Sequence, residues 1–192
     1  RQIKSFVTSL ARATVEGAAV KEHEQAPPLP VDTVCAIEGL CTSAHMLPLR
    51  VFAGVVCLCI HGVKRWADVQ HVTKVTHTCD GVMLKTYKSK RKDKPLLWAA
   101  LRRGFLEDGV WAEAFEATCL IAGLPKDDFL VLRPTADLQS FTRFPAGWSD
   151  ANRCLHALLV LAGMEALEAT RYSMHSCRHV YPTCAYQLLF PP

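Results

Sequence analysis

The chain has 192 residues, of which 50% are hydrophobic and 21% are charged. This is enough for one compact domain of ordinary size, and the composition excludes a disordered tail or a collagen-like repeat. No run approaches the roughly 18 uncharged apolar residues of a membrane-spanning helix, because the longest one, residues 51–60, ends at His61. The net charge of +4 is only mildly basic. We therefore expect a soluble, intracellular protein without a membrane partner, nuclear if its source is eukaryotic.

The first 30 residues predict a lead-in helix and a linker. Apolar residues recur at helical spacing between Ile3 and Val15, and three prolines within residues 25–30 must end that helix. We expect this lead-in segment over residues 1–30 and one domain over residues 31–192. Because the chain opens on arginine and stops abruptly, we expect both of its ends to be cut.

Five helical segments are predicted in the domain. They cover residues 32–43, 49–63, 106–122 and 150–164, with a last helix that begins between residues 173 and 176. Ser149 or Asp150 is the expected cap of the fourth helix. The stretch before that helix, rich in Pro and Arg, is predicted to be a loop.

The period of the sequence changes between the second and third helices. β-branched residues near Val72 and Val75, the pair Asp80-Gly81 and the alternation over residues 82–87 predict a hairpin, with a third strand over residues 95–100. The expected fold class is mainly α (α+β), a helical core with one small three-stranded antiparallel sheet. The nine cysteines form no CxxC pair, so reduced thiols, mostly in the core, are expected.

Three separate places carry side chains suited to binding phosphate. They are Arg65 after the apolar second helix, Lys88 in the turn after the hairpin, and His175 with Arg178 near the start of the last helix. An arginine beside a core is costly unless its planar fork meets an anion. Two arginines, a lysine and a histidine that converge on one point would form a phosphate clamp, as phosphoryl transfer requires.

The motifs around these residues resemble the catalytic domain of the tyrosine recombinases, the phage-integrase type of DNA breaking and rejoining enzyme. Residues 62–69 (GVKRWADV) resemble that family's Gly-Leu-Arg-x-x-Glu-Leu box, with Arg65 as its first arginine and Asp68 in place of the usual Glu. Residues 87–92 (YKSKRK) resemble its β-turn lysine motif, and residues 175–179 (HSCRH) resemble its His-x-x-Arg-His box. The resemblance covers the chain from about residue 34 to residue 190, with the motifs in the family's order.

The resemblance implies a reaction in which a tyrosine attacks a DNA phosphodiester, giving a 3′-phosphotyrosyl link and a free 5′-hydroxyl. Arg65 and Arg178 would hold the non-bridging oxygens, Lys88 would protonate the leaving oxygen, and His175 would bond the phosphate or assist proton transfer. No metal and no small-molecule cofactor are implied. The implied partners are double-stranded DNA and, on DNA, further copies of the chain.

Neighbouring residues have supporting roles in this interpretation. Four basic residues of the hairpin turn are expected to contact the DNA backbone: Lys85, Lys90, Arg91 and Lys92. Lys90 is also a rival to Lys88 as the catalytic lysine. Asp68 is expected to orient Arg65, and His179 to pack beside the site.

The family's nucleophilic tyrosine lies in a helix beyond the His-x-x-Arg box. Tyr181 and Tyr186 are too close to Arg178 in sequence to match it. The chain as given is therefore expected to bind a phosphate without cutting DNA. A non-catalytic DNA-binding or assembly module of the same fold is the alternative, and the type IB topoisomerases share the chemistry on a related core.

Plainer interpretations of the same residues stay open. Arg65 would suit the negative end of the preceding helix dipole, and the basic turn would suit a solvated loop. His175 and His179 are four residues apart, which is also a metal-pair spacing, with Cys177 or Cys184 as a third ligand. A metal-binding helical domain is thus a further alternative.

Overall fold

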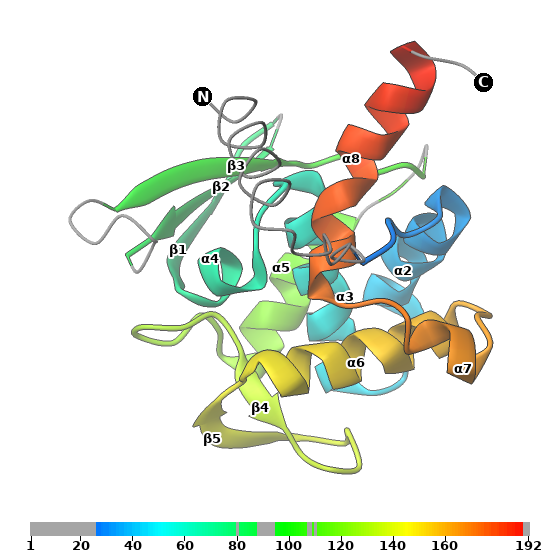
Figure 1. Cartoon of the computed structure of the whole chain (residues 1–192). Coiled ribbons are helices and arrows are strands. Elements are labelled where there is room, and N and C mark those ends of the chain that lie inside the picture. Colours follow the sequence, from blue (N-terminus) through cyan, green and yellow to red (C-terminus); the bar gives the residue numbers. More distant parts are fainter. Residues whose placement is uncertain (1–25, 80, 88–94, 107–108, 110, 190–192) are drawn as a thin grey trace, which may run out of the picture.

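The computed structural model of the chain describes residues 26–79, 81–87, 95–106, 109 and 111–189, without the side chains of residues 187–189. The predicted lead-in helix lies outside the described residues, and so do Lys88, Lys90, Arg91 and Lys92. The described elements follow one another as α2, α3, α4, β1, β2, β3, α5, β4, β5, α6, α7 and α8 (Figure 1).

Helix α3 (Leu47–His61) forms the centre of the core (Figure 1). From Pro48 to His61 its residues are buried apart from Arg50. A helix that is apolar on all sides needs partners on all sides. These partners are α2 (Val31–Ser43), α5 (Trp111–Ala122), α6 (Trp148–Leu161) and α8 (Met174–Leu189). Gly54 allows the close approach of α5, because a Cβ there would overlap the ring of Phe115.

The predicted three-stranded antiparallel sheet is confirmed. Its strands are β1 (Val72–His77), β2 (Gly81–Thr86) and β3 (Leu96–Leu101), in that spatial order. Leu84 and Trp98 pair across β2 and β3 and face the core. The indole N–H of Trp98 donates to the Thr86 hydroxyl at 2.9 Å, and that hydroxyl donates to the carbonyl of Asp68 at 2.8 Å. Asp68 belongs to α4 (Trp66–Gln70), so the sheet fixes the position of this short helix.

The loop predicted before α6 is partly wrong. It contains a second antiparallel pair, β4 (Leu132–Pro134) and β5 (Phe141–Pro145). Thr135 and Ser140 close its turn, with the N–H of Thr135 donating to the carbonyl of Ser140 at 2.9 Å. The strands are short and end in prolines, which usually argue against a strand. The small helices α4 and α7 (Ala166–Ala169) were also not predicted.

At two of the helix starts that differ from the predicted ones, a carboxylate side chain accepts backbone N–H groups. Helix α5 begins at Trp111 and not at 106, since Glu38 accepts the N–H groups of Phe105 and Leu106. Helix α6 begins at 148 with Gly147 as its N-cap residue. Asp150 reaches back and accepts the N–H of Gly147 at 2.9 Å, so it stabilises the helix start from the third position.

The fold class is mixed α+β, with helices around α3 and the sheet at one side (Figure 1). All nine cysteines are described as thiols, and six of them are buried: Cys41, Cys57, Cys59, Cys119, Cys154 and Cys177. The predicted core thiols are confirmed. Within the described ranges, no helix combines the length and apolar character needed to cross a membrane.

Candidate functional site

Arg65 lies at the junction of α3 and α4, and its side chain is exposed. The last carbonyl groups of α3 are taken by the backbone: Cys59 accepts from the N–H of Lys64 and Ile60 from that of Val63, both at 3.0 Å. Among the described residues, the Arg65 guanidinium has no hydrogen-bond or ion-pair partner. These contacts do not support a capping role for Arg65.

The His-x-x-Arg segment forms the first turns of α8. Two serines order this helix start: the N–H of Ser173 donates to Ser176 Oγ at 3.1 Å, and the N–H of His175 donates to Ser173 Oγ at 3.3 Å. The exposed His175 ring lies 4.8 Å from that of Trp148 at the start of α6. Arg178 is half-buried, and its side chain has no ion-pair partner within the described part of the chain.

The pKa of His179 reflects the positive charges around it. Its pKa is lowered from the ordinary value first by burial and then by the charges of Arg178 and His175. Arg178 and His175 are therefore close enough to His179 to act on its charge. We call Arg65, His175, Arg178 and His179 the cationic site.

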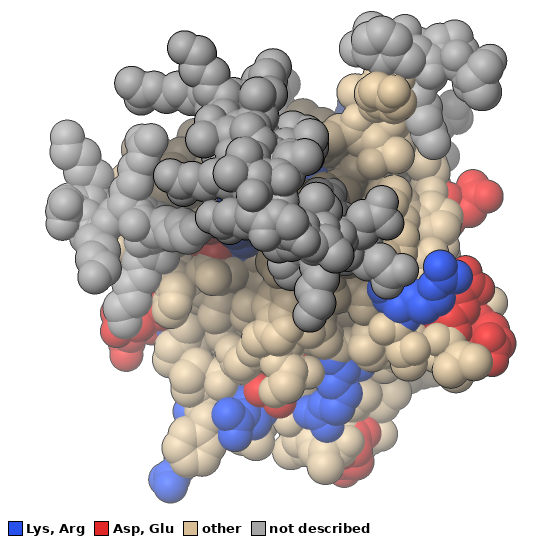
Figure 2. Space-filling model, viewed as in Figure 1, with Lys and Arg blue, Asp and Glu red and all other residues tan. Residues whose placement is uncertain are grey.

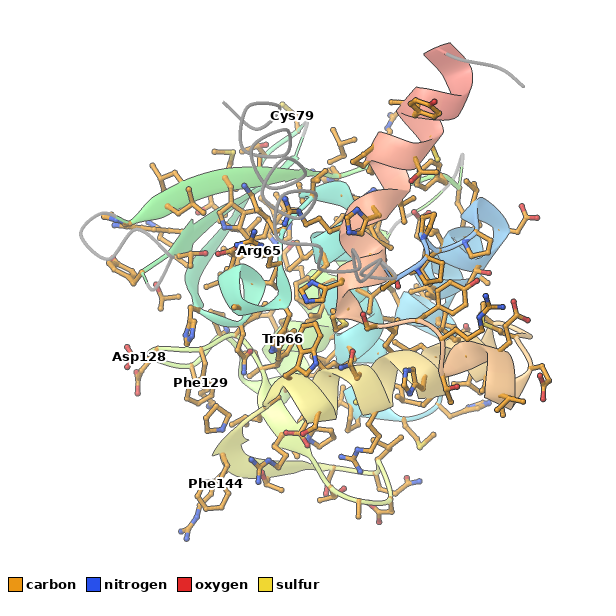
Figure 3. The ribbon with its side chains drawn as sticks, viewed as in Figure 1. Arg65, Trp66, Cys79, Asp128, Phe129 and Phe144 are labelled. Carbon is orange, nitrogen blue, oxygen red and sulfur yellow. The ribbon has the colours of Figure 1, made fainter. Side chains whose placement is uncertain are left out.

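The end of α3 adjoins both segments that carry the two arginines. The pKa of Cys59, in the last turn of α3, is raised by burial and then by the neighbouring thiol of Cys177 on α8. One turn further along α8, Tyr181 bonds to His61 at 2.8 Å. The stretch of α8 that carries the second arginine therefore lies beside the end of α3, only four residues before Arg65. Figure 3 shows Arg65 between the sheet and α8 in this view.

Two predicted neighbours of the site make other contacts. Asp68 forms no ion pair with Arg65 among the described residues, and its charge acts instead on Cys59. The ammonium group of Lys85, on β2, lies 4.8 Å from the ring centre of Tyr87. The roles predicted for Asp68 and Lys85 therefore stay predictions.

A buried network of Glu38, His61 and Tyr181 adjoins the cationic site. His61 Nε2 lies 2.9 Å from Glu38 Oε1, with both side chains fully buried, and Glu38 also accepts the N–H groups of Phe105 and Leu106, each at 3.0 Å. Burial is the largest influence and would raise the pKa of Glu38, but these bonds outweigh it and lower the pKa. An ionised carboxylate only accepts, so His61 Nε2 carries a hydrogen. The other ring nitrogen, His61 Nδ1, lies 2.8 Å from the Tyr181 hydroxyl oxygen.

Neither tyrosine that follows Arg178 on α8 is placed to attack a phosphate at the cationic site. The Tyr181 hydroxyl is bonded to His61, and burial, with the negative charge of Glu38, raises the pKa of Tyr181 to about 12. Tyr186 is 64% exposed, but it follows Arg178 by eight residues, which is about 12 Å along a helix. Both placements agree with the sequence argument.

The metal alternative gains no support. Among the described residues, no three His, Cys, Asp or Glu side chains gather as metal ligands would. His175 is exposed, whereas Cys177 is fully buried against α3. Residues two apart on a helix point in nearly opposite directions, so this pair cannot share an ion.

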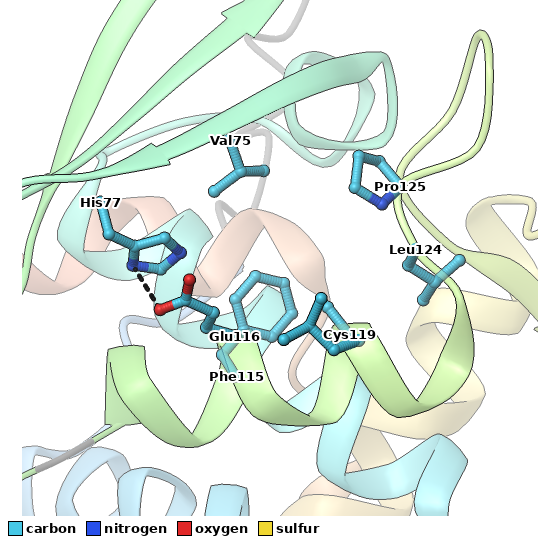
Figure 4. Close-up of a pocket in the computed structure, with 8 residues that line it drawn as sticks. Val75, His77, Phe115, Glu116, Cys119, Leu124 and Pro125 are labelled. Carbon is cyan, nitrogen blue, oxygen red and sulfur yellow. Dashed lines mark ion pairs between the residues drawn. The ribbon is translucent and has the colours of Figure 1, made fainter.

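Two cavities flank the sheet and α4. One, of about 570 Å³, lies beside α4, and we call it the α4 pocket. The other, of about 150 Å³, lies between β1 and α5 and is largely apolar (Figure 4). His77 Nδ1 and Glu116 Oε2 form an ion pair of 3.5 Å at its edge, beside Phe115 and Leu124. Sequence reasoning predicted neither cavity, because each is lined by segments far apart in the chain.

Trp148 is a further residue that sequence reasoning missed. It stands at the start of α6, 41% exposed, against His175. The signal available in the sequence was a tryptophan directly before a predicted helix. Figure 2 shows basic side chains over the β4–β5 pair and the start of α6, with acidic ones among them. They include Arg133 and Asp150, paired at 3.1 Å, so this surface is partly neutralised.

No protein-family model, curated protein or solved structure matches the chain.

Proposed function

We propose that the chain is a tyrosine-recombinase-type catalytic module whose cationic site binds a backbone phosphate of double-stranded DNA. The observation that carries this proposal is the pair Arg65 and Arg178, both without an ion-pair partner among the described residues and both beside the end of α3. Arg102 and Arg133, by contrast, have carboxylate partners. Like charges held near one another destabilise a protein. An anion bound between two cations replaces their repulsion with two attractive interactions.

The order of elements supports the family proposal. An arginine follows the central buried helix, a three-stranded sheet comes next, and the His-x-x-Arg helix then packs back on the central helix. The connection from β2 to β3 contains Lys88, Lys90, Arg91 and Lys92. In the proposal, Lys88 or Lys90 protonates the leaving oxygen while the neighbouring cations bind the backbone.

Each described residue of the cationic site has a distinct chemical task. Arg65 and Arg178 bind the two non-bridging oxygens and stabilise the charge that develops on them. His175 donates a hydrogen bond to the phosphate, and Trp148 restricts its ring. Because the hydroxyls of Tyr181 and Tyr186 lie elsewhere, strand cleavage needs a tyrosine from outside α8. A non-catalytic DNA-binding module of the same fold is the second candidate.

The binding half of the proposal is tested by duplex affinity as a function of salt. Arg65→Gln and Arg178→Gln should each weaken binding about tenfold, since charge-assisted hydrogen bonds contribute about 1.5–3 kcal/mol. Each should also lower the slope of log affinity against log salt by about one unit. Arg103→Gln is the matched control, because Arg103 is exposed and follows β3 at the end of the sheet opposite the basic turn. Equal losses in all three variants would contradict a specific site.

The catalytic half is tested with a duplex that traps covalent intermediates. The 192-residue chain should give no protein–DNA adduct, since no tyrosine of α8 reaches the cationic site. A version extended beyond residue 192 that forms an adduct in excess chelator, and loses it on Arg178→Ala, would favour the enzyme over the non-catalytic module. An adduct of the short chain that Tyr186→Phe abolishes would show that the nucleophile is misassigned.

A further inference from the structure

The α4 pocket is lined in part by α4, the short helix that Arg65 precedes. Its walls come from α4, from the loop before β4 and from the end of β5, and its lining includes Trp66, Gln70, His71, Asp127, Asp128 and Phe129. Trp66 directly follows Arg65, so the guanidinium and the pocket belong to the same helix start. Figure 3 shows Phe129 and Asp128 across from Trp66, on the same side of the molecule as Arg65.

The walls of this pocket are held together without a ligand. The side chain of Gln70 is the link: its Nε2 donates to the carbonyls of Val131 at 3.0 Å and Ala146 at 2.8 Å, and its Oε1 accepts the N–H of Val131 at 3.1 Å. The backbone carbonyl of Gln70 also accepts the N–H of Leu130 at 2.7 Å. All three walls are therefore joined through one buried side chain, and the pocket is preformed.

The lining combines flat apolar groups with hydrogen-bond acceptors. Trp66 stacks on Phe52, with ring centres 6.1 Å apart, which fixes its orientation, and the half-buried Phe129 lies in the opposite wall. The exposed carboxylates of Asp127 and Asp128 stand at the rim. Carboxylates repel a phosphate but accept hydrogen bonds from amino groups. The lining thus suits a flat, uncharged ring with N–H groups at its edge.

We propose that the α4 pocket takes an unpaired nucleobase from the DNA strand whose phosphate is bound by Arg65. This inference rests on the proposed function and adds a second point of contact to it. A base leaves the duplex at a cost of a few kcal/mol, which is smallest where it is already unpaired. Stacking on an aromatic side chain offsets part of that cost.

The acceptors at the rim also determine which base is preferred. Guanine, adenine and cytosine carry exocyclic amino groups, and guanine can present N1–H and N2–H together to one carboxylate. Thymine has no amino group. The pocket should therefore prefer an unpaired guanine to an unpaired thymine. A basic side chain of a protein partner is the competing occupant.

The test compares four duplexes of one sequence in a fluorescence-anisotropy titration. One is fully paired, and the others carry a single bulged guanine, a bulged thymine or a bulged abasic residue. The abasic duplex has the bend of a bulge without its base. We expect the guanine bulge to bind about tenfold more tightly than the abasic one, as stacking of one base provides, with thymine between them.

Variants assign the effect to the pocket. Phe129→Ala should remove the preference for guanine over the abasic residue. Phe144→Ala should not, because Phe144 is an exposed phenylalanine outside the pocket lining. The double variant Asp127→Asn, Asp128→Asn, which changes only exposed side chains, should make guanine and thymine equal. Equal affinity for guanine and abasic bulges, with paired-duplex binding that still depends on Arg65, would overturn the pocket proposal alone. Binding that does not depend on Arg65 would overturn the proposed function.

Discussion

Helix α8 contributes to two regions that differ in whether their charged groups have partners. In the buried network, every charge or dipole of Glu38, His61 and Tyr181 meets a partner within 3.0 Å. In the cationic site, one turn earlier on the same helix, Arg178 has no ion-pair partner among the described residues. Satisfied polar groups inside a protein fix its structure, whereas unsatisfied ones at its surface are available to a ligand. The first region should therefore determine stability and the second should determine binding.

The largest effect should come from removing the carboxylate of the buried network. Glu38→Ala leaves two backbone N–H groups and His61 without their acceptor, and we expect the free energy of unfolding to fall by about 3–5 kcal/mol. Chemical denaturation measures this change. Glu116→Ala is the control, because that carboxylate is half-exposed and its one ion pair among the described residues is with His77. Its loss should cost under about 1 kcal/mol. Similar losses in the two variants would show that the network has no special role.

A smaller effect is expected from the other end of the network. Tyr181→Phe keeps the ring, which stacks on Phe105 with centres 5.2 Å apart, and removes only the hydroxyl bonded to His61. The loss of one buried hydrogen bond should lower the free energy of unfolding by about 1–2 kcal/mol. Thermal and denaturant unfolding would both register it. An unchanged stability would mean that the hydroxyl is equally well bonded to water in the folded protein.

The network should also give stability a dependence on acid pH. The pKa of Glu38 in the folded protein lies below its ordinary value of 4.5, so the unfolded chain binds more protons as the pH falls through this range. The stabilisation from Glu38 is therefore complete above about pH 4.5 and is lost as the pH drops through the folded pKa. Wild-type stability should fall more steeply below pH 4.5 than that of Glu38→Gln. Parallel pH profiles of the two proteins would contradict this assignment.

Substitution of Arg178 should change stability least and DNA binding most. Arg178→Ala removes a half-buried charge that has no ion-pair partner in the described part of the chain, so the free energy of unfolding should stay within about 0.5 kcal/mol of the wild type. Duplex DNA affinity should nevertheless fall about tenfold. Measuring both quantities on one preparation separates this variant from Glu38→Ala. A loss of stability above 2 kcal/mol would place Arg178 in the structural region.

Much of the fold was predictable because its signals are local. The apolar run of α3, the alternation in β2 and the serines before α8 each predict an element from neighbouring residues. The misplaced start of α5 has a different cause. It depends on Glu38, which lies 67 residues before Phe105 in the chain and bonds to its N–H, and no local pattern records such a contact. The β4–β5 pair was missed because its strands are too short to show a period.

The residues of the candidate site likewise divide into those that a local motif predicts and those that only tertiary packing brings together. Arg65, His175 and Arg178 are candidates because each stands in a motif with its own order and spacing. The contact of Trp148 with His175, and the α4 pocket, depend on how α6 and the loop around Phe129 pack on distant elements. The role that the motif predicts for the Asp68 carboxylate stays a prediction, while the backbone carbonyl of Asp68 accepts the Thr86 hydroxyl. A motif identifies residue types, and tertiary packing determines their partners.

The buried cysteines of the core allow the opening motions of this protein to be followed by thiol labelling. Cys41 and Cys57 join α2 to α3 with their sulfurs 3.9 Å apart, while Cys79 is exposed on the sheet side. Burial raises the pKa of Cys57 well above its ordinary value, so a thiol reagent meets almost no thiolate there until the helices separate. The delay between labelling of Cys79 and labelling of Cys57 therefore reports how rarely the closed core opens. DNA that binds only the folded chain should lengthen that delay. The affinity for DNA can then be followed through the labelling rate of Cys57, without a probe attached to the protein beforehand.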